Sequence, residues 1–123
     1  IPYEMRVPFW SDGAHKYRWL MVPNDGTHNT VDEQIQYSEE GAWDFPEGAV
    51  LVKHFEYPMD ETDPTVVRRL ETRFSIKDSS GEYYGLAYRW NEAQTEATLL
   101  PQMIVAPAIS KQREVLSARS LAS

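Results

Sequence analysis

The sequence predicts an all-β domain, an antiparallel β-sandwich or jelly-roll-like fold followed by a short C-terminal tail or helix. Turn signals built from Gly, Pro, Asn and Asp recur up to Pro107, with short runs of β-branched and aromatic residues between them. One pair of runs alternates apolar and polar side chains with the period of two typical of a half-buried strand. The chain has 123 residues, 41% of them hydrophobic, which fits one globular domain.

The clearest predicted element is a hairpin over residues 66–90. Val66 to Lys77 forms its first strand and Glu82 to Trp90 its second, and Gly81 between them can adopt the positive φ of a short turn. The alternation within both strands places large apolar side chains on one side. We therefore expect an antiparallel pair in which five residues are buried: Leu70, Phe74, Leu86, Tyr88 and Trp90.

Three further strands are predicted upstream, at Lys16 to Val22, Thr30 to Tyr37 and Ala49 to Tyr57. The last of these starts with a run that is apolar on both faces, which favours the interior of a sheet. Residues 59–64 form an acidic loop bounded by proline. We expect a β-sandwich domain over 1–100 and an extended tail or short helix over 101–123, in which Ser110 is a candidate N-cap.

Composition excludes several classes of function. The net charge of −7 opposes binding to nucleic acid, which needs a basic patch. No apolar run reaches the roughly 18 residues of a membrane-spanning helix. The absence of cysteine excludes disulfides, thiol catalysis and Cys-ligated metal or haem. The chain opens at Ile1-Pro2 without a leader pattern, so we expect a processed product or an excised domain, and we expect no cofactor.

The sequence contains no catalytic signature and no clear metal motif, so we assign no catalytic residue. The three histidines, His15, His28 and His54, lack ligand spacing and are interpreted as surface or structural residues. Acidic residues of one loop could bind calcium, although such loops are usually only solvated. This calcium candidate comprises Asp60, Glu61 and Asp63.

Charged residues of the predicted strands favour an ion-pair network over a catalytic site, because structural pairing across sheets is far commoner. The polar residues of the motifs quoted below are expected to form this structural network: Asp12, Lys53, Glu71, Arg73 and Asn91. Aromatic residues exceed what one small core face needs, and although most of them are expected to fill the core, exposed ones could stack on sugars or anchor a protein. The candidate aromatic surface comprises Trp10, Trp19, Trp43 and Tyr83.

Four segments together resemble an uncharacterised domain of secreted bacterial multidomain proteins, which usually precedes a c-type haem-binding segment. They are residues 8–14 (PFWSDGA) with Lys16 and Arg18, residues 45–53 (FPEGAVLVK), residues 70–73 (LETR) and residues 88–97 (YRWNEAQTEA). The resemblance covers roughly Tyr3 to Leu100. It implies a periplasmic or extracellular location and association with c-type cytochromes in electron transfer. The expected Cys-x-x-Cys-His haem site is absent from Pro101 onward, so the haem partner is either missing or located on another chain.

These observations predict a non-catalytic accessory or structural module of an extracytoplasmic assembly, with a c-type cytochrome or another electron-transfer protein as its partner. The tail should take part in docking, because Met103, Ile104 and Val105 are apolar and flanking prolines prevent a continuous helix. Two alternatives stay open. An aromatic row on one flat face would favour a carbohydrate-binding module, and two facing carboxylates in a cleft would favour a small hydrolase.

Overall fold

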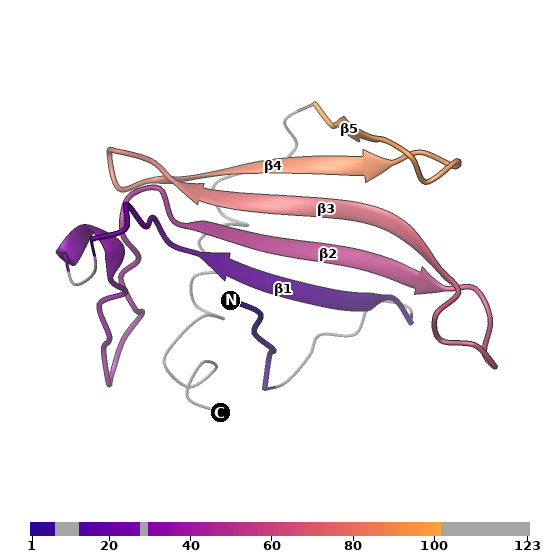
Figure 1. Ribbon diagram of the computed structural model, residues 1–123, viewed down its shortest axis with the longest axis horizontal. Helices are drawn as coiled ribbons and strands as arrows, with labels where there is room; N and C mark the ends of the chain where they lie inside the picture. The colour runs from indigo at the N-terminus through magenta and orange to yellow at the C-terminus, as the bar shows by residue number, and fades with distance from the viewer. Residues whose placement is uncertain (7–12, 28–29, 102–123) are drawn as a thin grey trace.

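The structure, a computed structural model, describes residues 1–6, 13–27 and 30–101. These residues form one antiparallel sheet in which five strands lie in chain order (Figure 1). The domain boundary at residue 100 and the tail with Met103, Ile104 and Val105 therefore stay predictions, because residues 102–123 lie outside the described part. The strands are β1 (His15–Met21), β2 (Val50–Pro58), β3 (Val67–Lys77), β4 (Tyr83–Trp90) and β5 (Ala97–Leu99).

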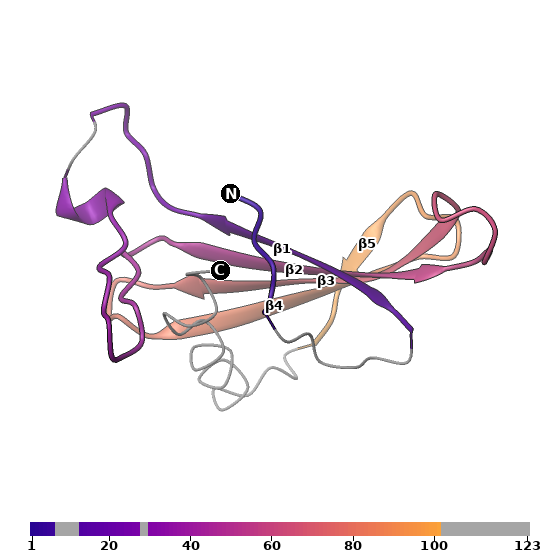
Figure 2. The ribbon, with the colours of Figure 1, turned by 90° about the horizontal axis from the view of Figure 1, so that it is seen from below.

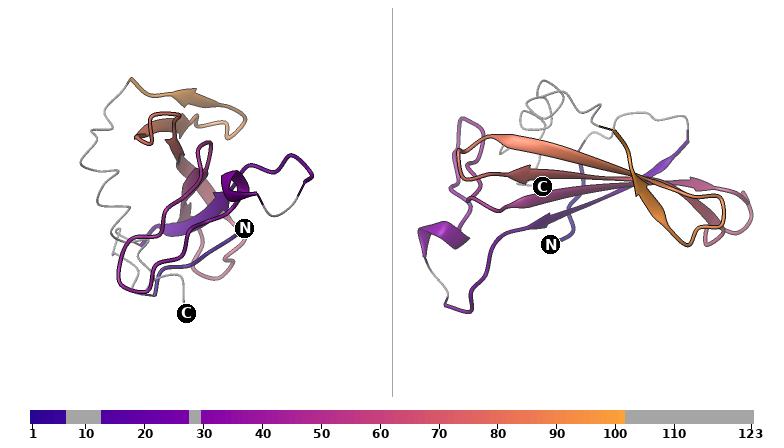
Figure 3. Two further views of the ribbon diagram at one scale, coloured as in Figure 1. Left: turned by 90° about the vertical axis from the view of Figure 1, so that its left-hand side faces the viewer. Right: turned by 90° about the horizontal axis from the view of Figure 1, so that it is seen from above.

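The predicted all-β class is confirmed, whereas a sandwich or jelly roll is not. The strands twist as they cross the sheet, as Figures 2 and 3 show. Within residues 1–6, 13–27 and 30–101 there is one sheet, without a second sheet packed on it. The same residues include no helix long and apolar enough to span a membrane.

The predicted hairpin is confirmed as the antiparallel pair of β3 and β4, with Gly81 in its turn at φ +84°. The prediction that its apolar side chains are buried was wrong for Leu70, which is exposed. Phe74, Leu86, Tyr88 and Trp90 are only half-buried. The reason is that the described residues form a single sheet and place no second layer over this face of it.

The core lies at one end of the sheet. Leu20, Phe45, Ala49 and Leu51 are buried together, and Tyr3 packs against them. The apolar run that begins at Ala49 leads into β2, which lies between β1 and β3 as its double-sided apolar pattern predicts. The long connection from β1 to β2 folds at this end of the sheet, while the β2–β3 loop lies at the opposite end (Figure 1).

Two elements differ from the sequence prediction. A strand over Thr30 to Tyr37 was wrong, because this segment contains the 3-10 helix η1 (Val31–Glu33) and only an isolated bridge between Gln36 and Asp44. The short strand β5 was not predicted. The N-terminal residues add a bridge between Pro2 and Trp19 along the free edge of β1.

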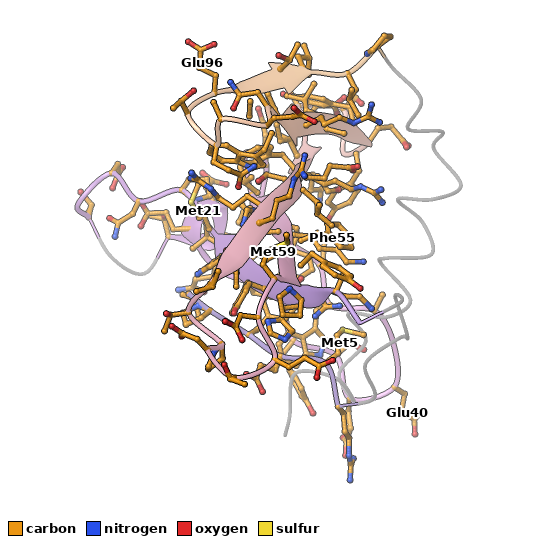
Figure 4. The ribbon with its side chains drawn as sticks, turned by 90° about the vertical axis from the view of Figure 1, so that its right-hand side faces the viewer. Met5, Met21, Glu40, Phe55, Met59 and Glu96 are labelled. Carbon is orange, nitrogen blue, oxygen red and sulfur yellow. The ribbon has the colours of Figure 1, made fainter. Side chains whose placement is uncertain are left out.

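Alternation along the strands gives the sheet two distinct faces, because successive side chains point to opposite sides. Figure 4, which looks along the strands, shows Met21 and Phe55 on opposite sides of the sheet. We call the side with Met21 the open face and the side with Phe55 the core face. The core face carries Leu20 and Leu51 of the core together with most of the strand lysines and arginines.

Candidate functional site

The open face is a continuous apolar and aromatic surface across all five strands. Cross-strand register aligns its side chains in rows, for example Trp19 with Val52, Val52 with Phe74 and Phe74 with Leu86. A neighbouring row aligns Met21 with Val50, Ile76 and Tyr84. The face comprises Tyr17, Trp19, Met21, Val50, Val52, His54, Thr72, Phe74, Ile76, Tyr84, Leu86, Tyr88, Trp90 and Leu99.

Much of this surface is in contact with solvent in the described chain. Tyr17, Trp19, Met21, Tyr84 and Leu99 are each between 36% and 53% exposed. Isolated exposed apolar residues are common on proteins, but a contiguous patch indicates an interaction site. The open face is therefore the strongest candidate functional surface among residues 1–6, 13–27 and 30–101.

His54 lies on the open face between Tyr17 of β1 and Thr72 of β3, and aromatic rings surround it. The ring centroids of Tyr17 and Trp19 each lie 6.5 Å from that of His54, and the Trp90 centroid lies 6.4 Å away, edge-on. Tyr17 and Trp19 also stack on each other, with centroids 6.1 Å apart. These contacts hold a polar ring within an apolar surface, which requires that its nitrogens find partners.

Both ring nitrogens of His54 do have partners. Nδ1 lies 2.7 Å from Thr72 Oγ1, and Nε2 lies 3.2 Å from Glu56 Oε1. Thr72 Oγ1 also accepts a hydrogen bond of 3.0 Å from Trp90 Nε1. Because the Glu56 carboxylate can only accept, we assign the Nε2 proton of a neutral His54 to that bond, which leaves Nδ1 to accept from the Thr72 hydroxyl. The chain of donors then runs in one direction and fixes the imidazole.

The rim of this cluster is held by Arg69. Its guanidinium lies 4.0 Å from the centre of the Trp90 ring and donates to the Gln94 backbone carbonyl. The Gln94 side chain bonds to the backbone N–H and carbonyl of Arg69, so the β4–β5 turn is joined to β3. Trp90 is thus fixed in place by contacts on its ring face and on its nitrogen.

The order Thr72, His54, Glu56 resembles that of a nucleophile, base and acid, but its surroundings do not suit acyl transfer. Both strands are interior strands, and the backbone N–H groups of a strand point along the sheet toward neighbouring strands rather than out from the face that carries this cluster. The only carboxylates within the described strands, Glu56 and Glu71, lie on opposite faces and cannot act as a hydrolytic pair. What the contacts of this cluster do is fix the orientation of the His54 and Trp90 rings on the open face.

The predicted aromatic surface is not brought together. Trp19 lies on the open face, whereas Tyr83 follows the alternation of the core face. Trp43 lies in the β1–β2 connection, where its ring packs edge-on against Tyr37 and its nitrogen donates to the Ser38 carbonyl. Trp10 lies outside the described residues.

Three of the residues predicted to form a polar network share the core face. Lys53 lies directly opposite Arg73 on the neighbouring strand, and Arg73 forms an ion pair with Glu71. Asn91 lies apart from them in the β4–β5 turn, where its side-chain oxygen accepts from the Thr95 backbone N–H. Asp12 lies outside the described residues.

The acidic loop does not gather its carboxylates around a common point. Asp60 accepts hydrogen bonds from the backbone N–H and hydroxyl of Thr62, and Asp63 accepts the same pair from Thr65. These bonds lower the pKa of both aspartates. The loop that contains Glu61 is therefore built from two local turns. In the described part of the chain, no three side chains of the types that bind metals cluster together.

Comparisons of the chain with protein-family models, curated proteins and solved structures found no match. The resemblance to a haem-associated domain therefore stays a prediction.

His54 lacks metal-ligand spacing and was interpreted from the sequence as a surface or structural histidine, so its place at the centre of the aromatic cluster was not predicted. The signal lay in the alternation itself: His15, Tyr17, Trp19 and Met21 occupy one side of β1, and the two strands of the hairpin show the same preference. Which of these side chains meet depends on strand register, and this is where the structure adds information.

Proposed function

We propose that this domain is a non-catalytic docking module whose open face receives another protein domain. The observation that carries the proposal is the row of exposed apolar side chains on one side of a single sheet. β-domains normally cover such a face with a second layer, because each sheet must bury its apolar side. The partner would supply that layer.

The size of the face fits a specific protein interface. Large side chains carry roughly 150–250 Å² each, so Tyr17, Trp19, Met21, Tyr84 and Leu99 together expose on the order of 400 Å². The half-buried side chains between them add to this area. One partner of a standard interface buries about 800 Å², so the open face is of the right order. Its aromatic content is also typical of interface hot spots.

The partner we propose is a c-type cytochrome domain in an extracytoplasmic assembly, either periplasmic or extracellular. This part of the proposal follows from the resemblance of the four sequence segments. The open face supports it in one respect: it is apolar and carries few charges, so it suits a partner that buries apolar surface rather than a nucleic acid or an anionic membrane.

Mutation of the open face tests the proposal. Titration of the domain with a c-type cytochrome from the same source should show saturable binding by calorimetry. Trp19→Ser combined with Tyr84→Ser should weaken it at least about tenfold, because aromatic anchors dominate such interfaces. Tyr37→Ser is the matched control, since Tyr37 is 66% exposed but lies away from the sheet. Equal binding by the double variant and the control would refute the proposal.

A carbohydrate-binding module is a second candidate, favoured by the stacked and exposed rings of Tyr17 and Trp19. It has less support because sugar recognition also needs hydrogen-bonding groups, and those of His54 and Thr72 are already used internally. Affinity electrophoresis against soluble β-glucan and xylan distinguishes the two candidates. Retardation that disappears with Trp19→Ser would favour the carbohydrate module.

A further inference from the structure

Three positive charges lie abreast on the core face, in what we call the cationic row: Arg18 of β1, Lys53 of β2 and Arg73 of β3. Strand register pairs Arg18 directly with Lys53, and Lys53 directly with Arg73. Neighbouring strands lie about 4.8 Å apart, and like charges directly opposite each other destabilise a sheet. Two such pairs in succession require a compensating interaction.

The described chain supplies only part of that compensation. Glu71 forms an ion pair with Arg73. Lys53 Nζ and the Arg73 guanidinium each lie 5.0 Å from the centre of the Phe55 ring, whose face attracts cations. Within residues 1–6, 13–27 and 30–101, neither Arg18 nor Lys53 forms an ion pair with a carboxylate.

Burial makes this arrangement more unfavourable. Arg18 is buried and Lys53 is half-buried, so both charges have lost part of their hydration. Burial, followed by repulsion from Arg18, Arg73 and Lys16, lowers the pKa of Lys53 to about 8. The next position of the same face on β3, toward the core, is Ser75, whose buried hydroxyl lacks a hydrogen-bond partner among the described residues.

We propose that the cationic row is a binding site for an oxyanion, namely a carboxylate or phosphate group. Two guanidinium groups can each donate a pair of parallel hydrogen bonds to such a group, and the ammonium of Lys53 between them adds a third positive charge. The bound anion relieves both like-charge pairs. The site lies on the face opposite the docking surface, so it does not depend on the proposed function.

NMR titration tests this proposal with inorganic phosphate and succinate as separate probes, at constant ionic strength maintained with sodium chloride. At least one probe should bind saturably and shift the signals of Lys53 and Arg73. Binding should also raise the titration midpoint of the Lys53 side chain, because a nearby anion favours the ammonium form. A response to phosphate alone identifies a phosphate-type ligand, and a response to succinate alone identifies a carboxylate.

Lys53→Met should reduce the affinity by about tenfold or more, as removal of a central charge contact predicts. Arg73→Met provides a second variant, and because Arg73 is exposed this substitution should leave the fold intact. Arg68→Met is the matched control, because it removes one positive charge from β3 at an exposed pair with Glu92. Failure of both probes to saturate, or equal affinity in Lys53→Met and Arg68→Met, would overturn the proposal.

Discussion

Replacement of Lys53 by methionine should stabilise the domain at neutral pH in phosphate-free buffer. Methionine keeps the apolar stem of the side chain but removes the charge between Arg18 and Arg73. A fall in the pKa of Lys53 from 10.5 to about 8 corresponds to about 3 kcal/mol at 1.36 kcal/mol per unit. Lys53 is only half-buried, so screening by water and salt reduces the expected gain to about 1–2 kcal/mol.

The effect has a defined pH window. Below about pH 8 Lys53 is charged in both the folded and unfolded states, so its unfavourable contribution is fully present. Between about pH 8 and the unfolded-state pKa of 10.5 the unfolded chain binds more protons, and the stability of the wild type therefore rises relative to the variant. Above that window the lysine is neutral in both states and this contribution is gone.

Urea unfolding followed by tryptophan fluorescence at about pH 7 and about pH 10.5 measures this difference in free energy of unfolding. Lys77→Met is the informative control, because Lys77 donates to Asp44 at 2.7 Å and to the Phe45 carbonyl at 2.6 Å. Removal of that paired charge should destabilise the domain. A Lys53→Met variant that is less stable than wild type at pH 7, or a difference independent of pH, would refute the reasoning.

Three further predictions follow from individual contacts. Thr72→Val should cost about 1–3 kcal/mol in urea unfolding because it leaves Trp90 Nε1 and His54 Nδ1 without their shared partner, while Thr72→Ser should keep most of the stability. Asn91→Ala should cost about 1 kcal/mol by the same assay, since its side chain closes the β4–β5 turn, and should leave cytochrome binding unchanged. Calcium in place of EDTA should not shift the melting temperature, because the Asp60 carboxylate already accepts bonds from Thr62.

The sequence predicts those parts of the fold that depend on local pattern. The hairpin of β3 and β4 follows from its alternation and from Gly81, and the interior position of β2 follows from its apolar start. The strand predicted over Thr30 to Tyr37 was wrong because its evidence was only that Val31, Ile35 and Tyr37 would share one face. Backbone hydrogen bonds from Glu33 to Thr30 and from Gln34 to Val31 instead form a 3-10 turn. Strand β5 is too short for periodicity to reveal.

The candidate sites depend on which residues of neighbouring strands lie opposite each other, and the patterns within single segments of the sequence do not predict this register. The pairing of Tyr17 with His54 and of His54 with Thr72 brings together residues from three separate segments. A register shift between Phe55 and Glu56 changes which residues meet beyond it. The same argument applies to the cationic row, whose members look like ordinary alternating charges in each strand alone.

Hydroxyl-radical footprinting with mass spectrometry tests the docking proposal most directly, because it reports the exposure of individual side chains with and without the cytochrome. Met21 on the open face and Met59 in the β2–β3 loop are 53% and 57% exposed, so they form a matched pair within one molecule. The docking proposal predicts that the cytochrome protects Met21, Trp19 and Tyr84 from oxidation while Met59 stays reactive. Equal oxidation of Met21 and Met59 in the presence of saturating cytochrome would contradict it.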